Sequence, residues 1–220
     1  MKPRVAVIGT VFLDCKGFAR QHYNPYGRNL GSVKFVHGGV GRNVAQNLSL
    51  LNLEVLFVST IDDSPMGKEV AFRLRHAGVN LDYLRVNKNR GMGLWLALLD
   101  QQGNLVGSIS QMPDLSLLQE LIVEKGKEII ERVNHVVLEL DLNAEISRMV
   151  TNLARLHSKP IYGIPGNLEV VLKHRDLLGD IECFICNDVE AGKLIGQDLT
   201  SLEAGEILQE LKRLIRAVGL

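Results

Sequence analysis

The chain has 220 residues, of which 46% are hydrophobic and 23% are charged. This composition is typical of a globular domain with a packed core and excludes an intrinsically disordered chain. Lys and Arg together number 25, as do Asp and Glu, so no overall field attracts nucleic acid or an anionic membrane. We therefore expect neither as a partner.

The location of the protein is predicted from three further features. The longest uninterrupted apolar stretch, residues 91–99, is far shorter than the roughly 20 residues that cross a bilayer. The N-terminus lacks the apolar region and cleavage site of a secretory signal. Three cysteines, an odd number, argue against a disulfide framework. We expect a cytoplasmic protein.

In the first third of the chain, short apolar runs alternate with segments of helical period. We expect a strand over residues 4–9, a helix from about residue 41 and a strand over residues 54–59. The next helix should begin at Pro65 and stop before Gly78, because proline suits a first helical turn and glycine a helix end. This order predicts an α/β fold with a largely parallel sheet.

The alternation continues toward the C-terminus. Helices are expected over residues 115–132, 144–156, 188–195 and 202–217, and strands over residues 135–140, 160–163 and 182–186. Two segments depart from it, because residues 33–37 alternate like a strand and residues 94–99 and 105–110 flank a turn like a hairpin. We expect one domain over residues 1–220, with lid segments at about 15–37 and 88–112 over a site at the strand ends.

The most informative segment is residues 38–48, which read GGVGRNVAQNL. Three glycines end an extended segment and open a helix, so the backbone can turn sharply and approach a ligand. Asn43 then lies in the first helical turn, where its amide offers a donor and an acceptor to sugar hydroxyls. A glycine-rich turn with Asn43 as a local cap is the equally weighted alternative. The pattern is neither a P-loop nor a dinucleotide-binding fingerprint.

Several motifs together resemble the PfkB carbohydrate kinase family, also called ribokinase-like. They are the glycine run, Asp14 after the first strand, the DDxxxG pattern at residues 62–67 and NDVE at residues 187–190. The resemblance implies a three-layer α/β sandwich with a mostly parallel central sheet plus a small β-sheet lid. It also implies ATP-dependent phosphorylation of a sugar or nucleoside hydroxyl. Within the family the pattern is most similar to pseudouridine kinases, although sugar kinases share much of it.

The resemblance assigns the substrate side to five residues. Asp14, Gly39 and Asn43 would bind hydroxyls of the substrate sugar, and Gly38 with Gly39 would form the hinge on which the lid closes. Asp141 would be the acidic residue at the end of a strand on the substrate side. For Asp14, the competing interpretation is a strand-end cap.

The nucleotide side is assigned in the same way. The resemblance implies that Asn187 lies near phosphate and that Glu190 orders the water shell of Mg²⁺, with ATP and Mg²⁺ as the cofactors. A surface helical pair is the alternative for these two residues. Asn143 could act near the substrate or cap a helix, and the sequence does not favour one role over the other.

Four basic residues surround the proposed site in the sequence, namely Lys16, Arg28, Lys34 and Arg42. They could compensate the charge of a phosphorylated product. The pattern favours solvated charges on the lid.

The catalytic base of the family lies in a later Gly-Ala-Gly-Asp motif, and these 220 residues contain no such sequence. We therefore assign no catalytic residue and expect a C-terminally truncated, poorly active or inactive kinase. The alternative is a non-catalytic pseudoenzyme that binds a sugar or nucleoside. Family members that dimerise through their lids imply a possible homodimer here.

Overall fold

The structure is a computed structural model that describes residues 2–88, 90–140, 142–166, 168–199 and 201–217, with side chains described to residue 212. The larger sheet contains β1 (Arg4–Ile8), β4 (Glu54–Ile61), β5 (Asn80–Val86), β8 (His135–Glu139), β9 (Ile161–Ile164) and β10 (Cys183–Phe184). The smaller sheet contains β2 (Phe12–Ala19), β3 (Gly31–Gly38), β6 (Gly93–Leu99) and β7 (Leu105–Gln111). The helices are α1 (Val40–Leu50), α2 (Pro65–His76), α3 (Ser116–Glu131), α4 (Ala144–Leu156), α5 (Glu169–Lys173), α6 (Asp188–Ile195) and α7 (Ala204–Ala217), with a 3₁₀ helix at Arg175–Asp180.

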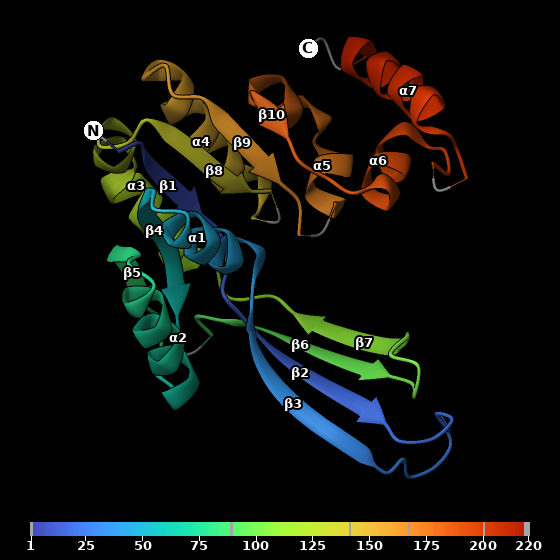
Figure 1. The fold of residues 1–220 in the computed structure, drawn as a ribbon. Helices are drawn as coiled ribbons and strands as arrows, with labels where there is room; N and C mark the ends of the chain where they lie inside the picture. The colour runs from blue at the N-terminus through green and yellow to red at the C-terminus, as the bar shows by residue number, and fades with distance from the viewer. Residues whose placement is uncertain (1, 89, 141, 167, 200, 218–220) are drawn as a thin grey trace.

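The larger sheet is parallel throughout and has the strand order β10-β9-β8-β1-β4-β5. Figure 1 shows helices on both of its faces and the smaller sheet projecting away from this body. The expected α/β fold with a mostly parallel sheet and a separate small sheet is confirmed.

Alternation along β1 explains the three layers. Val5 and Val7 belong to a core that includes residues of α1 and α2, whereas Ala6 and Ile8 belong to a core that includes residues of α3 and α4. Successive side chains of a strand point to opposite faces of a sheet. Because its last four residues are all apolar and buried, β1 needs helices on both sides.

The boundary signals that were expected at α2 act as predicted. Pro65 is the first helical residue, Ser64 is the N-cap and its Oγ accepts a hydrogen bond of 3.1 Å from the Gly67 amide. The helix ends before Gly78, which has a φ of 87°. These local interactions are sufficient to place both ends of this helix.

The expectations fail in four places. β2 and β5 were not predicted as strands, because β2 mixes polar and apolar residues that are all half-buried and β5 alternates weakly at the edge of the sheet. The expected strand over residues 182–186 is only two residues long. The short α5 and the 3₁₀ helix after it were also missed, because each is too brief to show a helical period.

The smaller sheet has the order β3-β2-β6-β7, with β2 antiparallel to β3 and parallel to β6. Its register aligns Phe35, Cys15, Leu96 and Ile109 in one row across the four strands. Aligned residues lie on the same face of a sheet. Asp14 is in the adjacent row, which faces the opposite side.

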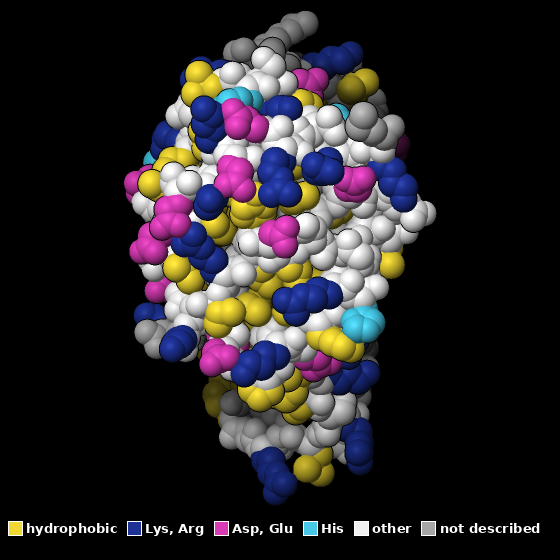
Figure 2. Space-filling model, turned by 90° about the vertical axis from the view of Figure 1, so that its left-hand side faces the viewer, with side chains coloured by type: hydrophobic (Ala, Val, Ile, Leu, Met, Phe, Trp, Pro, Cys, Tyr) yellow, Lys and Arg dark blue, Asp and Glu magenta, His cyan; other side chains and the backbone are white. Residues whose placement is uncertain are grey.

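The distribution of charged side chains on the surface agrees with the equal numbers of basic and acidic residues. On the face shown in Figure 2, the Lys and Arg side chains are interspersed with Asp and Glu side chains. Within the described residues, no helix combines the length and apolar content that crossing a membrane requires.

Candidate functional site

The candidate site lies at the carboxyl end of β1. There the segments that follow β1 and its neighbour β8 lead to helices on opposite faces of the sheet. β1 pairs with β4 on one side and with β8 on the other, both in parallel. At such a switch point the loops after the two central strands diverge and open a crevice at their carboxyl ends. Thr10 follows β1 at this crevice, Glu139 ends β8, and α1 begins beside them.

Glu139 joins these three elements. Its Oε2 accepts hydrogen bonds from the backbone amides of Thr10 and Gly41, at 2.7 and 2.8 Å, and its Oε1 accepts one of 2.7 Å from the Thr10 hydroxyl. Glu139 is buried, with 3% of the residue exposed. The carboxylate therefore fixes the loop after β1 against the start of α1.

Glu139 also satisfies the first turn of α1. The N-cap of this helix is Gly39, which has no side chain to accept a hydrogen bond from the amides of the first turn. The Gly41 amide is satisfied from the distant strand β8 instead. Burial raises the pKa of the Glu139 carboxyl, while the hydrogen bonds from Thr10 and Gly41 act in the opposite direction.

The glycine turn before α1 is constrained by its surroundings. Gly39 has a φ of 97°, and a Cβ at this position would lie 2.5 Å from the Thr10 carbonyl oxygen. A Cβ on Gly38 would lie 2.4 Å from Oδ1 of Asp14. Only glycine combines this φ with so close an approach. The turn thus brings the carboxylate of Asp14 next to the start of α1.

Asp14 and Asn43 both lie at this turn, on different elements. Asp14 is the third residue of β2, within the smaller sheet, so the expected position at the end of the first strand is wrong. Its Oδ2 is 3.5 Å from Lys16 Nζ, and its side chain is 16% exposed. Asn43 lies in the first turn of α1, as predicted, and is exposed; its backbone N–H donates to the Gly39 carbonyl at 3.0 Å.

Beyond β8, two predicted residues have different outcomes. Asp141 lies outside the described residues. Asn143 is the N-cap of α4, where its Oδ1 accepts a hydrogen bond of 2.8 Å from the Ile146 amide. The structure thus bears out the helix-cap alternative for Asn143.

Asn187 and Glu190 form a capping box at the start of α6. Asn187 Oδ1 accepts from the Glu190 amide at 2.8 Å, and Glu190 Oε2 accepts from the Asn187 amide at 2.9 Å. Each side chain therefore satisfies an amide that the helix leaves free. Both residues are engaged in local structure, which is a complete explanation for this pair of residue types at this spacing.

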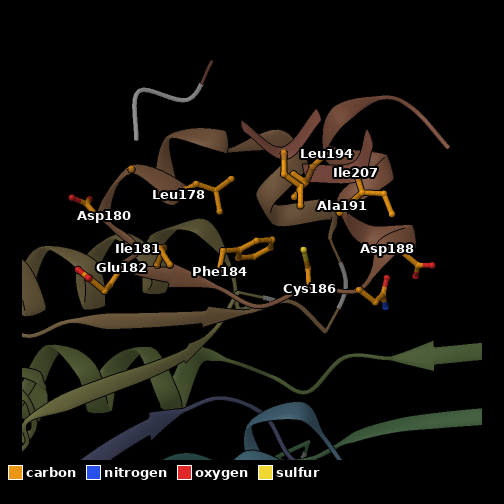
Figure 3. Close-up of a pocket in the computed structure, with 13 residues that line it drawn as sticks. Leu178, Asp180, Ile181, Glu182, Phe184, Cys186, Asp188, Ala191, Leu194 and Ile207 are labelled. Carbon is orange, nitrogen blue, oxygen red and sulfur yellow. The ribbon is translucent and has the colours of Figure 1, made fainter. Parts of the chain in front are cut away.

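A cavity of about 850 Å³ lies beside Asn187, between β10, the 3₁₀ helix, α6 and α7. Figure 3 shows Phe184 and Cys186 on its sheet side and Leu194 and Ile207 on its helix side. Most of the wall is apolar. The charged lining residues are Asp180, Glu182 and Asp188, with no Lys or Arg among the described residues that line it.

This lining does not fit a triphosphate, because carboxylates repel phosphate and no cation compensates it. It also lacks a built metal centre, since no cluster of three or more potential metal ligands occurs in the described part of the chain.

Sequence reasoning missed Glu139 at this site and assigned Arg42 to the wrong environment. The signal for Glu139 is an acidic residue within the apolar run of residues 136–140, since a buried carboxylate needs specific partners. Arg42 was grouped with solvated charges of the lid, which is wrong, because the residue lies in α1 and is 9% exposed. The buried positions Gly41, Arg42 and Ala45 follow the helical period, and this spacing could have indicated that Arg42 faces inward.

Comparison with known proteins gives a consistent result. The model of the pfkB family of carbohydrate kinases matches residues 2–218. The chain is 37% identical over 200 residues to a guanosine-inosine kinase of Exiguobacterium acetylicum, covering 91% of this chain and 66% of that protein. It is 27% identical over 225 residues to a pseudouridine kinase of Escherichia coli, covering 99% of this chain and 71% of that protein. The chain spans about two thirds of the length of these curated relatives.

Solved structures agree in fold. A carbohydrate kinase from Agrobacterium tumefaciens aligns with a TM-score of 0.77 and 27% identity, covering 100% of this chain and 68% of that one. A ribokinase of Arabidopsis thaliana complexed with ribose and ATP aligns with a TM-score of 0.79 and 20% identity, covering 100% of this chain and 70% of that one. The ribokinase-like fold expected from the sequence is confirmed.

Proposed function

Because the chain belongs to the PfkB family of carbohydrate kinases, we propose that it serves the ATP-dependent phosphorylation of a ribonucleoside hydroxyl, with pseudouridine preferred. The observation that carries this proposal is the convergence of Asp14, the Gly38-Gly39 turn and Asn43 at the switch point of the sheet. The similarity to a guanosine-inosine kinase and a pseudouridine kinase supports a nucleoside. A free sugar is the alternative acceptor.

The proposed site binds the sugar through complementary groups. The Asp14 carboxylate accepts hydrogen bonds from vicinal hydroxyls, the backbone N–H of Gly39 donates one, and the exposed Asn43 side-chain amide can do both. Asp141 is the further acidic residue proposed on this side. Closure of the smaller sheet about Gly38 and Gly39 would exclude water that competes with the substrate hydroxyl.

On the nucleotide side, we place Asn187 near phosphate and Glu190 as a second-layer ligand of Mg²⁺ through water. The capping box leaves Oε1 of Glu190 and the side-chain Nδ2 of Asn187 without a hydrogen bond to the α6 backbone. These atoms supply one acceptor and one donor. A triphosphate also requires cations that the adjacent cavity lining does not provide.

The Gly-Ala-Gly-Asp motif of the family is absent from these 220 residues. We therefore propose that residues 1–220 bind the acceptor without efficient phosphoryl transfer. In an assay with pseudouridine, Mg²⁺ and ATP, this chain should form no measurable product. Robust turnover would contradict this proposal, and a downstream reading frame that encodes Gly-Ala-Gly-Asp would rule out the pseudoenzyme alternative.

Binding itself is tested by isothermal titration calorimetry with pseudouridine, guanosine, inosine, ribose and fructose. Asp14→Ala and Asn43→Ala should each weaken nucleoside affinity by about tenfold or more, the effect of losing one strong hydrogen bond. Asn47→Ala is the matched control, because Asn47 is exposed one turn further along the same helix. Equal affinity of the wild type and both site variants would contradict the site, and no binding of any probe would contradict the function.

We also propose that the smaller sheet mediates homodimer formation in the cytoplasm. Phe35 and Ile109 are 62% and 68% exposed, and Leu96 is 40% exposed in the same row. A continuous apolar face of this kind is typical of a protein interface, and it lies opposite the face that carries Asp14. Sedimentation velocity should show a dimer that Phe35→Asp converts to monomer, and a wild-type monomer at high concentration would contradict the proposal.

A further inference from the structure

Arg42 is a largely buried basic residue beside Asn43, whose side-chain amide is proposed to bind the substrate. The residue is 9% exposed, and its Nη1 donates to Asn43 Oδ1 at 2.9 Å and to the His37 carbonyl at 3.4 Å. Its Nε has no hydrogen-bond partner among the described residues. Arg42 therefore contacts two neighbours, one from α1 and one from the end of β3.

Arg42 lacks the carboxylate that a buried cation usually has. It lines a groove of about 740 Å³ between α1, α2 and β3, together with Glu69 and Arg73. The Glu69 carboxylate is hydrogen-bonded to Arg73, at 2.7 and 2.9 Å. No ion pair between Arg42 and an acidic residue occurs in the described part of the chain. Burial lowers the pKa of Arg42, and the charge of Arg73 lowers it further.

The chemistry of the contact determines how Asn43 is oriented. A guanidinium group has only donors, so the amide atom 2.9 Å from Nη1 must be the oxygen. The Nδ2 group of Asn43 consequently points away from Arg42. Within the described residues it has no hydrogen-bond partner, and the residue is exposed.

Resting on the proposed function, we propose that Arg42 is a positioning residue that presents Asn43 Nδ2 as a donor to the substrate. The substrate group recognised there is an acceptor oxygen, either a ribose hydroxyl or a base carbonyl. Without Arg42, the amide of Asn43 could rotate and offer either atom, which would weaken discrimination. Burying a charge without an ionic partner costs stability. The presence of Arg42 is then explained by its role in binding.

The decisive variant is Asn43→Asp, which separates the two effects. A carboxylate keeps the oxygen that faces Arg42 and gives this buried cation a charged partner, while an acceptor replaces the Nδ2 donor. The melting temperature should rise, and the affinity for pseudouridine, guanosine or inosine should fall by about tenfold. Asn47→Asp makes the same chemical change at an exposed position of α1 and should alter neither quantity.

Arg42→Met tests the same contact from the other side. Methionine fills similar space without a buried charge, so the melting temperature should stay the same or rise, while nucleoside affinity falls by about fivefold or more. In the double variant that combines Arg42→Met with Asn43→Asp, the stabilisation by Asn43→Asp should disappear, because the guanidinium group that faces the new carboxylate is gone. A positioning role thus predicts loss of binding with no loss of stability.

Each result has a definite meaning. The inference would be overturned if Arg42→Met bound nucleosides with the affinity of the wild type. It would also be overturned if Asn43→Asp stabilised the protein equally with and without Arg42. Either result would leave the proposed function intact. If the wild type binds none of the three nucleosides, the proposed function is overturned and the recognition role of Arg42 with it.

Discussion

Replacing Glu139 with alanine should destabilise the protein strongly, because three buried hydrogen bonds depend on this carboxylate. The change leaves the amides of Thr10 and Gly41 without an acceptor in the interior. Each such group costs about 1–3 kcal/mol, so the two amides together should cost about 2–6 kcal/mol. For a chain of this length the melting temperature should fall by about 4–24 °C.

Glu139→Gln separates the hydrogen bonds from the charge. The amide oxygen of glutamine can accept from both backbone amides, and its nitrogen can donate to the Thr10 hydroxyl. All three contacts are thus preserved without burying a charge. At pH 7 this variant should be within about 1 kcal/mol of the wild type or more stable.

The difference in stability between the wild type and Glu139→Gln should change with pH in a defined direction. Burial raises the pKa of Glu139 in the folded state, so its contribution to stability is fully present below the pKa of the unfolded chain and is lost as pH rises through the folded pKa. Glutamine does not titrate. The stability of Glu139→Gln relative to the wild type should therefore increase as pH rises above about 4.5.

Urea unfolding followed by circular dichroism measures these differences between pH 4 and pH 8. Glu120→Ala is the control, because this carboxylate is exposed on α3, and it should change stability by less than about 0.5 kcal/mol. A loss below about 1 kcal/mol for Glu139→Ala, or equal losses for the alanine and glutamine variants, would refute the role of Glu139 in joining β1, β8 and α1.

Three further outcomes are expected. Gly39→Ala should destabilise the fold by about 2 kcal/mol more in thermal unfolding than Gly103→Ala, because both glycines have positive φ but only at Gly39 would the Cβ meet other atoms within 4 Å. Burial lowers the pKa of His37, so wild-type stability should fall as pH drops below about 6.5, and His37→Gln should lose part of this dependence in urea unfolding. Asn143→Ala should cost about 1 kcal/mol by removing the α4 cap, and a neutral result in urea unfolding would contradict that cap.

Local patterns account for what the sequence predicted well. The Pro65 helix start and the turn at Gly78 depend on a few neighbouring residues, so their chemistry can be identified without the fold. The same locality explains an ambiguity at Asn187 and Glu190. An Asn followed three residues later by Glu is both the family motif and a capping box, and the structure demonstrates the capping box.

The elements that were missed have weak local signals. β2 is half-buried along its whole length and β5 lies at the edge of the sheet, so neither shows clean alternation. Their strand character comes from partners elsewhere in the chain, β3 and β6 for β2 and β4 for β5. The position of Asp14 within β2 could therefore not be deduced from its neighbours in sequence.

The sequence by itself determined the α/β class, the order of most elements and the glycine turn that opens α1, because apolar periodicity and backbone preference act over a few residues. Only the tertiary structure decided the environments of Glu139 and Arg42. Glu139 meets Thr10 and Gly41 across separations of 129 and 98 residues, and Arg42 is enclosed where α1 meets the end of β3. The burial of a charged side chain depends on which distant groups surround it, and that is fixed only when the layers pack together.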